Sequence, residues 1–227
     1  MSGPAYLEWL RGRRSVRAFA PRSIDRALLE RVVEAAITAP SSTNRQPWRF
    51  AIVTAPTVRA ALVDAVRRKT GEMTDIIRRS HHAEDFGSYG DFFFEPLETA
   101  AAIVVPQYRE YPDLLAELIR SGGGDPACLP TASAMQAELC AASAATMALL
   151  LQAYAEGLGA CWMAGPMVAR DEVQSLLGIA APWRMVGAVA LGWPAEAPGA
   201  RPRKSISQVV QWHDEPGGTD ERLDAGP

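Results

Sequence analysis

The sequence between Ser133 and Glu156 predicts one long helix, because it contains no proline or glycine and its only charged residues are glutamates. Thr131 or Ser133 can cap its amino end, and Gly157 and the glycine two residues later can close the other end at little conformational cost. At about 1.5 Å per residue, such a helix would be roughly 36 Å long. It would cross a whole domain, so the rest of the chain must be arranged around it.

Apolar side chains surround this helix instead of forming a single stripe. One face consists of Met135, Leu139, Ala142, Thr146, Leu149 and Leu150, and the other of Cys140, Ala144, Met147, Leu151 and Tyr154. Both faces should therefore be buried, by lipid, by other elements of the same chain or by a second copy. Lipid fits worst, since the segment is rich in alanine and falls short of about 20 strongly apolar residues. Small side chains suit close packing across a dimer axis, so we expect a homodimer.

Composition bounds the remaining possibilities. A chain of 227 residues with 48% hydrophobic and 22% charged residues can bury one substantial core. Its formal net charge of −3 gives no positive electrostatic field that would attract nucleic acid. The three cysteines lack C-x-x-C spacing, and no secretory signal opens the sequence, which together favour reduced thiols in the cytoplasm. We expect one domain over residues 1–213, a disordered tail over 214–227, and no nucleic-acid or membrane partner.

Periodicity and turn residues predict a mixture of helices and strands. Helices are expected over residues 24–38, 57–69, 73–79, 113–120 and 170–177, and strands over 49–54, 100–105, 160–163 and 185–191. About four strands separated by helices of unequal length favour an α+β or layered α/β/α domain over a regular doubly wound sheet. The common glycine-rich phosphate motifs and the G-x-S-x-G and H-E-x-x-H motifs are absent.

Two polar stretches are candidates for ligand binding. Arg13-Arg14-Ser15-Val16-Arg17 packs three guanidiniums and a hydroxyl together, which indicates either a solvated basic corner or a cradle for a phosphate. The second stretch, Ser41-Ser42-Thr43-Asn44-Arg45-Gln46-Pro47-Trp48, is either a plain loop or a source of groups that both donate and accept at the polar edge of a flat heterocycle.

The region 71–124 has the least regular pattern. Its aromatic residues Phe86, Tyr89 and Phe92-Phe93-Phe94 indicate either a flap over a pocket or rings that fill the core. Histidines and acids at His81, His82, Glu84 and Asp85 raise the possibility of a metal site. Adjacent histidines on a helix point about 100° apart, so this possibility is disfavoured and no metal is predicted.

The polar stretches, taken together, match a known family. The segment 13–17, the string Pro40-Ser41-Ser42-Thr43-Asn44-Arg45-Gln46-Pro47-Trp48, the segment Gly157-Leu158-Gly159-Ala160-Cys161-Trp162 and the basic Arg201-Pro202-Arg203-Lys204 resemble, in order and spacing, the FMN-dependent nitroreductase superfamily. The resemblance extends from about Leu7 to Trp212. It implies a layered α+β homodimer with a mixed, mostly antiparallel sheet, whose long central helices pack across the two-fold axis.

The resemblance also implies roles for residues that the composition marks only as candidates. FMN would be held by Arg13, Arg14, Ser15 and Arg17, with Arg201 and Arg203 completing the phosphate site and Ala164 and Gly165 presenting backbone amide to flavin N5. Ser41, Ser42, Asn44 and Gln46 would come from the other subunit. NADH or NADPH would donate hydride to the flavin, which would pass it to a small aromatic or quinone-like acceptor, and no side chain is assigned as catalytic.

Other members of this fold remain alternatives. They include an enzyme that breaks its flavin to make dimethylbenzimidazole, a deiodinase of tyrosine derivatives, dehydrogenases of cyclic peptides, and modules that bind a flavin or deazaflavin without catalysis. Ser15 occupies a position where the flavin-cleaving enzyme would be expected to carry an acid, which argues mildly against that activity.

Overall fold

The predicted central helix is present but begins later than expected. The computed structural model describes residues 2–86, 89–128, 135–199 and 201–213, so the predicted caps at 131 and 133 and the predicted tail over 214–227 lie outside the described residues. Helix α7 spans Ala137–Ala155 and follows Gln136, whose φ of 52° lies in the left-handed region. At its other end Gly157 has a φ of 76°, and the amide of Leu158 donates to the carbonyl of Ala153 at 2.9 Å, which closes the helix as predicted.

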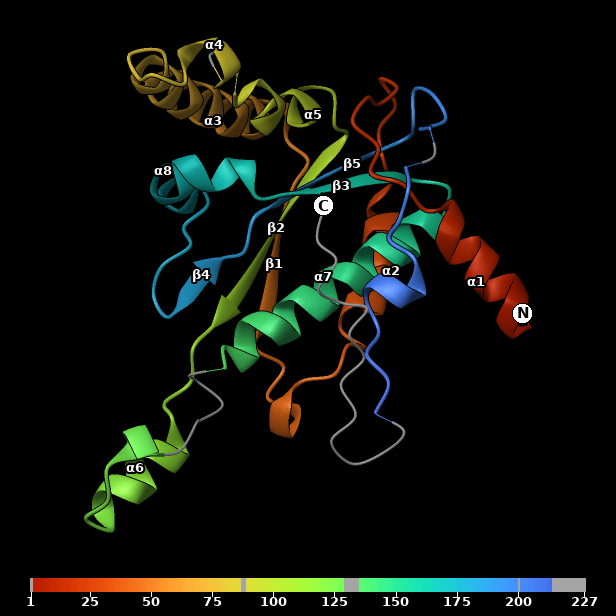
Figure 1. Cartoon of the computed structure of the whole chain (residues 1–227). Coiled ribbons are helices and arrows are strands. Elements are labelled where there is room, and N and C mark those ends of the chain that lie inside the picture. Colours follow the sequence, from red (N-terminus) through yellow and green to blue (C-terminus); the bar gives the residue numbers. More distant parts are fainter. Residues whose placement is uncertain (1, 87–88, 129–134, 200, 214–227) are drawn as a thin grey trace.

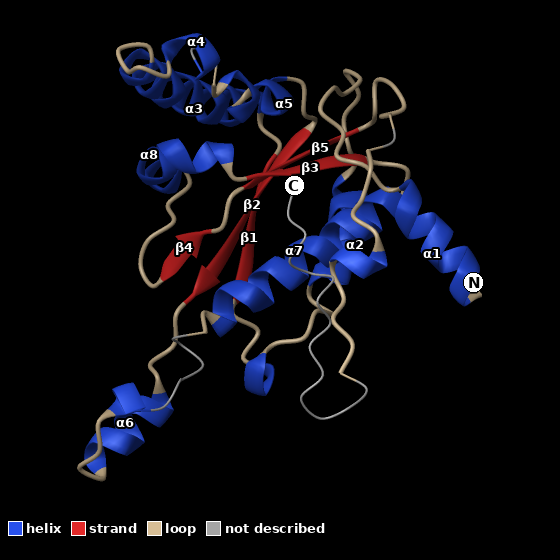
Figure 2. Cartoon of the chain, viewed as in Figure 1, coloured by secondary structure: helices blue, strands red, loops and turns tan. Residues whose placement is uncertain are grey.

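A five-stranded antiparallel sheet forms the middle of the molecule (Figures 1 and 2). The strand order is β1-β2-β5-β3, and the short β4 pairs with β2 beside β5. The strands span β1 Trp48–Val53, β2 Ala102–Arg109, β3 Gly159–Met163, β4 Trp183–Met185 and β5 Ala188–Gly192.

Two strand predictions were wrong. Strand β2 continues through Pro106 instead of ending there, because Pro106 lies between the part of β2 that pairs with β5 and the part that pairs with β4. Proline lacks an N–H, but its carbonyl still accepts from the amide of Val186 at 2.9 Å. The strand predicted over 185–191 is divided at Gly187, whose φ of 145° suits glycine and turns the chain from β4 into β5.

Helices cover both faces of the sheet. Their bounds are α1 Gly3–Gly12, α2 Arg26–Ala36, α3 Pro56–Ile77, α4 Ala83–Phe86, α5 Glu95–Glu98, α6 Leu114–Ser121 and α8 Arg170–Leu176. The two helices predicted over 57–69 and 73–79 are one continuous α3, because Gly71 sits on its exposed side while Thr70 and Thr74 are buried on the other. Asp113 caps helix α6, its carboxylate accepting from the amide of Ala116 at 3.1 Å, and the helix lies away from the sheet (Figure 1).

The sheet separates two apolar clusters, which gives the predicted layered α+β architecture. Helices α2 and α7 pack on one face, and α3 and α8 lie on the other (Figure 1). Alternation along β2 matches this arrangement, since Ala102 and Val104 face α7 while Ile103 and Val105 point to the opposite cluster. Both faces of β5 and of the first part of β2 are therefore buried, and these segments are continuous apolar runs.

Helix α7 is buried on one side only. Alanines at 141, 142, 145 and 153 bring it close to the sheet and α2, whereas Cys140 is exposed and Met147 keeps 39% of its surface accessible on the opposite side. Within the described parts of the chain, α7 is the one helix long and apolar enough to cross a bilayer, a test that core helices also pass. Because 44% of its apolar window is already buried inside the protein, it has the character of a core helix with one open face.

Two glycines provide a matched test of packing. A Cβ at Gly159 would lie 2.7 Å from the Cβ of Val16, whereas a Cβ at Gly71 on α3 would meet nothing within 4 Å. Gly159→Ala should lower the free energy of unfolding by about 1–3 kcal/mol through overpacking. Gly71→Ala should raise it by up to about 1 kcal/mol through helix propensity. Urea denaturation measures both, and equal stability of the two variants would contradict this account.

Candidate active site

The arginine-rich segment 13–17 runs beside the start of β3. Ser15 forms a parallel bridge with Ala160, and the amide of Val16 donates to the carbonyl of Ala160 at 3.1 Å. The close approach depends on Gly159, which has no side chain to meet Val16. Val16 is buried in the same core cluster as Cys161, and the charges of Arg17 and Arg13 and the Ser15 side chain act on the Cys161 thiol.

Cys161 sits among these polar groups as a buried thiol. It is 4% exposed, and the Ser15 hydroxyl lies within hydrogen-bonding reach of its sulfur. Burial raises the pKa of the thiol, and the charges of Arg17 and Arg13 and the Ser15 contact only partly oppose this shift. The thiol therefore stays protonated near neutral pH and supplies no negative charge to the arginines.

Arg203 approaches Arg13 from the other end of the described chain. Burial lowers the pKa of Arg13, and the positive charges of Arg203 and Arg14 lower it further. Among the described residues, no carboxylate forms an ion pair with Arg13, Arg17 or Arg203. Arginine does not lose its proton in proteins, so a bound anion would relieve this repulsion. Arg201 is exposed on the same segment as Arg203.

Arg14 differs from its neighbours. Its guanidinium donates to the carbonyl of Arg13 at 2.8 Å and to the carbonyl of Arg11 in the last turn of α1. A cation at this position also interacts favourably with the negative carboxyl end of the helix dipole. In this structure Arg14 closes α1, and its predicted contact with a cofactor stays a prediction.

A cavity of about 430 Å³ adjoins the arginine segment. It is lined by Arg17, Cys161 and the turn that holds Ala164 and Gly165, together with Tyr89, Phe92, Phe93 and Pro96. The Phe93 ring packs directly on Gly165, since a Cβ there would lie 2.5 Å from the ring. Of the rings considered as a flap, Phe93 is 8% exposed and belongs to the core, whereas Phe92 is 50% exposed and lines the cavity.

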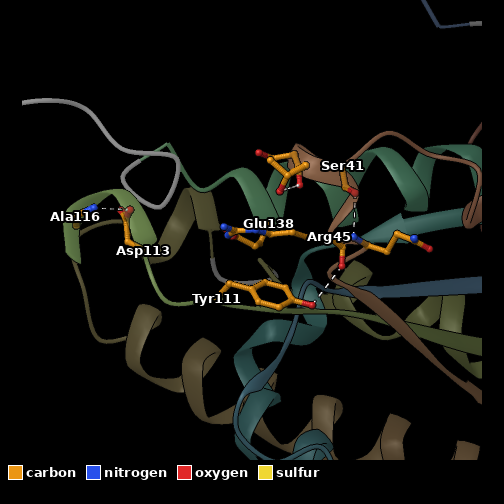
Figure 3. A network of polar contacts seen from close by, with 9 residues as sticks. Ser41, Arg45, Tyr111, Asp113, Ala116 and Glu138 are labelled. Atoms are coloured by element: carbon orange, nitrogen blue, oxygen red, sulfur yellow. Dashed lines mark hydrogen bonds and ion pairs between the residues drawn. The ribbon is translucent and has the colours of Figure 1, made fainter. Parts of the chain in front are cut away.

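The second predicted stretch lies elsewhere. The loop that holds Ser41, Ser42, Asn44 and Gln46 sits at the amino end of α7, where Arg45 forms an ion pair with Glu138 at 3.3 Å and its carbonyl accepts from the Tyr111 hydroxyl at 3.3 Å (Figure 3). The Ser41 hydroxyl accepts from the amide of Gln46 at 3.0 Å. Thr43, Asn44 and Gln46 in this loop have positive φ angles, which residues other than glycine rarely adopt. Such strained backbone often occurs at functional sites.

The two polar stretches lie at opposite ends of α7. The loop contacts Glu138, whereas Arg13 shares a cavity of about 580 Å³ with Leu150 and Tyr154 near the carboxyl end. Sixteen residues of helix separate Glu138 from Tyr154, which corresponds to about 24 Å. One chain therefore brings together Arg13, Ser15, Arg17, Ala164, Gly165 and Arg203, but not Ser41, Ser42, Asn44 and Gln46.

Sequence reasoning left three site residues unassigned. Cys161 was grouped with the other two cysteines as a reduced thiol, and Tyr89 and Phe92 were members of an undivided aromatic segment. The alternation of β3, which places Cys161 on the opposite side from the exposed Trp162, is a signal that could have drawn attention to the thiol. His81 and His82 have ring centroids 3.9 Å apart, and no three His, Cys, Asp or Glu side chains gather as metal ligands in the ranges that the structure describes.

Comparisons with known proteins agree with this architecture. The chain is 29% identical over 202 residues to an NADH dehydrogenase of Thermus thermophilus, covering 88% of this chain and 92% of that protein. It is 29% identical over 112 residues to an iodotyrosine deiodinase of Haliscomenobacter hydrossis, so the match spans about half of each chain. A solved structure of oxidised iodotyrosine deiodinase bound to FMN and 3-iodo-L-tyrosine superposes with a TM-score of 0.69 at 20% identity, covering 92% of this chain and 98% of that chain.

The similarity to that solved structure confirms the predicted fold class. The family is shown by a comparison of sequences. The model of the Nitroreductase family matches residues 10–193, which is most of the chain. The protein therefore belongs to the Nitroreductase family.

Proposed function

We propose that this protein is an FMN-dependent oxidoreductase that takes hydride from NADH or NADPH and reduces a small aromatic or quinone-like acceptor. The observation that carries this proposal is the convergence of Arg13 and Arg203, two guanidiniums from distant parts of the chain with no carboxylate partner in the described structure. Guanidiniums bind phosphate through paired, charge-assisted hydrogen bonds. A single phosphate group would relieve the repulsion that lowers the pKa of Arg13.

The adjoining cavity fits the rest of this cofactor. Ser15 and Arg17 follow the phosphate-binding end, and the turn at Ala164 and Gly165 borders the same cavity, with the Phe93 ring packed on Gly165. When bound, FMN supplies the hydride chemistry at its N5 atom. Arg17 would place a positive charge beside the ring edge that becomes negative on reduction, and the apolar walls would exclude water. Solved structures of similar fold contain FMN, which supports the choice of cofactor.

A second copy of the chain is part of this proposal. The loop 41–46 and the arginine segment would meet only if two α7 helices pack antiparallel, with a two-fold axis near Met147 at the middle of the open face. The amino end of one helix would then lie beside the carboxyl end of the other. Ser41, Ser42, Asn44 and Gln46 of one copy would complete the site of its partner, and the apolar face of α7 would be buried.

The phosphate site can be tested by substitution. Arg203→Ala should weaken FMN binding by about 1.5–3 kcal/mol, the range for a lost charge-assisted hydrogen bond, which is about a 10-fold or larger increase in Kd. Lys204→Ala is the matched control, because it removes a neighbouring exposed cation that is not assigned to the phosphate. Flavin fluorescence titration measures both. Wild-type protein that stays colourless after incubation with FMN would refute the proposal.

The dimer is best tested on the open face of α7. Leu150 is only 5% exposed and packs in the core of its own chain, so a charge there would unfold the protomer itself. Met147→Arg should instead yield a folded monomer with little FMN, because a buried charge at the interface costs several kcal/mol. The exposed Ile76→Arg on α3 is the control. Light scattering measures the mass, and a Met147→Arg dimer with full FMN content would contradict this arrangement.

Thiol labelling gives an independent measurement of the same interface. Cys128 and Cys140 are both exposed in the single chain, but only Cys140 lies on the open face of α7. In the wild-type dimer Cys128 should react rapidly and Cys140 slowly. In the Met147→Arg variant both should react rapidly.

Reductive deiodination is a second candidate activity. It is favoured by the similarity to iodotyrosine deiodinase in both sequence and fold. The test is release of iodide from 3-iodo-L-tyrosine by the FMN-loaded protein with dithionite as the reductant. Iodide release at a rate above that of free FMN would support this candidate, and equal rates would exclude it.

A further inference from the structure

We propose that a cluster of alternating arginine and aromatic side chains near the amino end of α7 binds the diphosphate of the donor nucleotide whose nicotinamide lies on the partner's flavin. The cluster consists of Arg45, Tyr111, Arg109, Trp183 and Arg49, and it is called the arginine–aromatic cluster below. This inference rests on the proposed function and its dimer, because it assigns residues to the part of NADH or NADPH that does not react.

Each ring of the arginine–aromatic cluster meets two guanidiniums. The Cζ atoms of Arg45 and Arg109 lie 5.3 and 4.7 Å from the centroid of the Tyr111 ring. The Cζ atoms of Arg49 and Arg109 lie 4.6 and 5.9 Å from the centroid of the Trp183 ring. These are cation–π distances, and Arg109 connects the two rings.

The register of the sheet brings three members of the cluster together. Trp183 on β4 pairs with Arg109 on β2, and Arg49 on β1 pairs with Gln107, which is two residues earlier in β2. Residues two apart in a strand point to the same face, so Arg49, Arg109 and Trp183 share one face at the end of the sheet. The Nε of Arg49 also donates to the side-chain oxygen of the buried Gln107 at 3.0 Å, which fixes this guanidinium.

Two guanidiniums of the cluster have no carboxylate partner. Arg45 forms its ion pair with Glu138, but no ion pair joins Arg49 or Arg109 to an acid in the part of the chain that the structure describes. Arg109 is half-buried, and its Nε is buried without a hydrogen-bond partner among the described residues. Rings that stack on a guanidinium leave the N–H groups in its plane able to donate, which suits recognition of a phosphate.

The position of the cluster indicates which anion it would bind. Arg45 belongs to the loop 41–46, and the Tyr111 hydroxyl donates to its carbonyl at 3.3 Å (Figure 3). In the proposed dimer this loop completes the partner's site, so the cluster would lie at the outer edge of the partner's cavity. That cavity, of about 430 Å³, would take the flavin ring and the nicotinamide, which leaves the two phosphates of the donor outside it. The unpaired Arg49 and Arg109 match this pair of phosphates.

The experiment compares two classes of hydride donor by stopped-flow measurement of flavin reduction in the FMN-loaded dimer. NADH and NADPH carry the diphosphate, whereas 1-benzyl-1,4-dihydronicotinamide has the same reacting ring and no phosphate. Arg49→Gln and Arg109→Gln should each raise the Kd of the dinucleotide donor by about 3- to 10-fold, less than for a fully buried charge-assisted hydrogen bond because Arg49 is exposed. The rate with the benzyl donor and the FMN content should stay unchanged.

Arg22→Gln is the matched control. The Cζ of Arg22 lies 3.7 Å from the centroid of the Trp193 ring, and Arg22 is exposed and forms no ion pair among the described residues. It therefore has the same chemistry as Arg49 but lies outside the arginine–aromatic cluster. This variant should bind the dinucleotide donor as the wild type does, and a Kd raised as much as in Arg49→Gln would reduce the effect to net charge and overturn the proposal.

A mixed dimer tests whether the cluster acts on the partner's site. One chain carries Arg49→Gln and the other Arg203→Ala, which weakens FMN binding. At limiting FMN the flavin occupies the Arg49→Gln chain, whose donor would be held by the intact cluster of the other chain. The Kd of the dinucleotide donor should therefore return to the wild-type value. A Kd as high as in the Arg49→Gln homodimer would contradict action across the interface.

Two further results would overturn the proposal. One is an unchanged Kd of the dinucleotide donor in both variants, or in Arg49→Gln alone if Arg109→Gln does not fold. The other is an equal loss of rate with the benzyl donor, which would show that the variants disturb the flavin site itself. Failure of the wild-type protein to bind FMN or to form a dimer would instead refute the proposed function, so the two failures are distinguishable.

Discussion

The packing of α7 on the sheet is the interaction on which the rest of the structure depends. Its alanine face lets the helix approach β2 and β3 closely, and small side chains lose little conformational entropy on burial. The bidentate ion pair of Arg31 with Glu156, at 3.0 and 3.2 Å, joins its carboxyl end to α2. Helix α7 thereby fixes where the arginine segment and the loop 41–46 lie, one at each of its ends.

Electrostatics decides what the fold can bind. The protein carries a net charge of −3, yet the charge of Arg203 helps to lower the pKa of Arg13, and neither residue forms an ion pair with a carboxylate in the described structure. The buried thiol of Cys161 does not compensate, since its raised pKa keeps it neutral. Uncompensated charge beside a low-dielectric cavity is unfavourable in the free protein and favourable once an anion binds. The site is therefore built at some cost to stability, as functional sites often are.

Local signals predicted most elements of the fold. The capping aspartate of α6, the glycine that ends α7 and the apolar run of β5 all act within a few residues, so they can be read without the rest of the chain. The errors arose where a distant partner decided the outcome. Pro106 is tolerated in β2 because it falls between two pairing partners, and Gly71 does not end α3 because the buried face of that helix continues past it.

The sequence by itself determined which residues could bind an anion and which could cap, turn or fill a core, because these properties belong to the side chains and their immediate neighbours. Tertiary structure alone decided how they combine. It brought the charge of Arg203 to bear on Arg13, turned Arg14 back onto α1, and buried Phe93 while leaving Phe92 exposed. Those outcomes depend on contacts between residues far apart in the chain, and no local pattern encodes which distant segment will lie beside another.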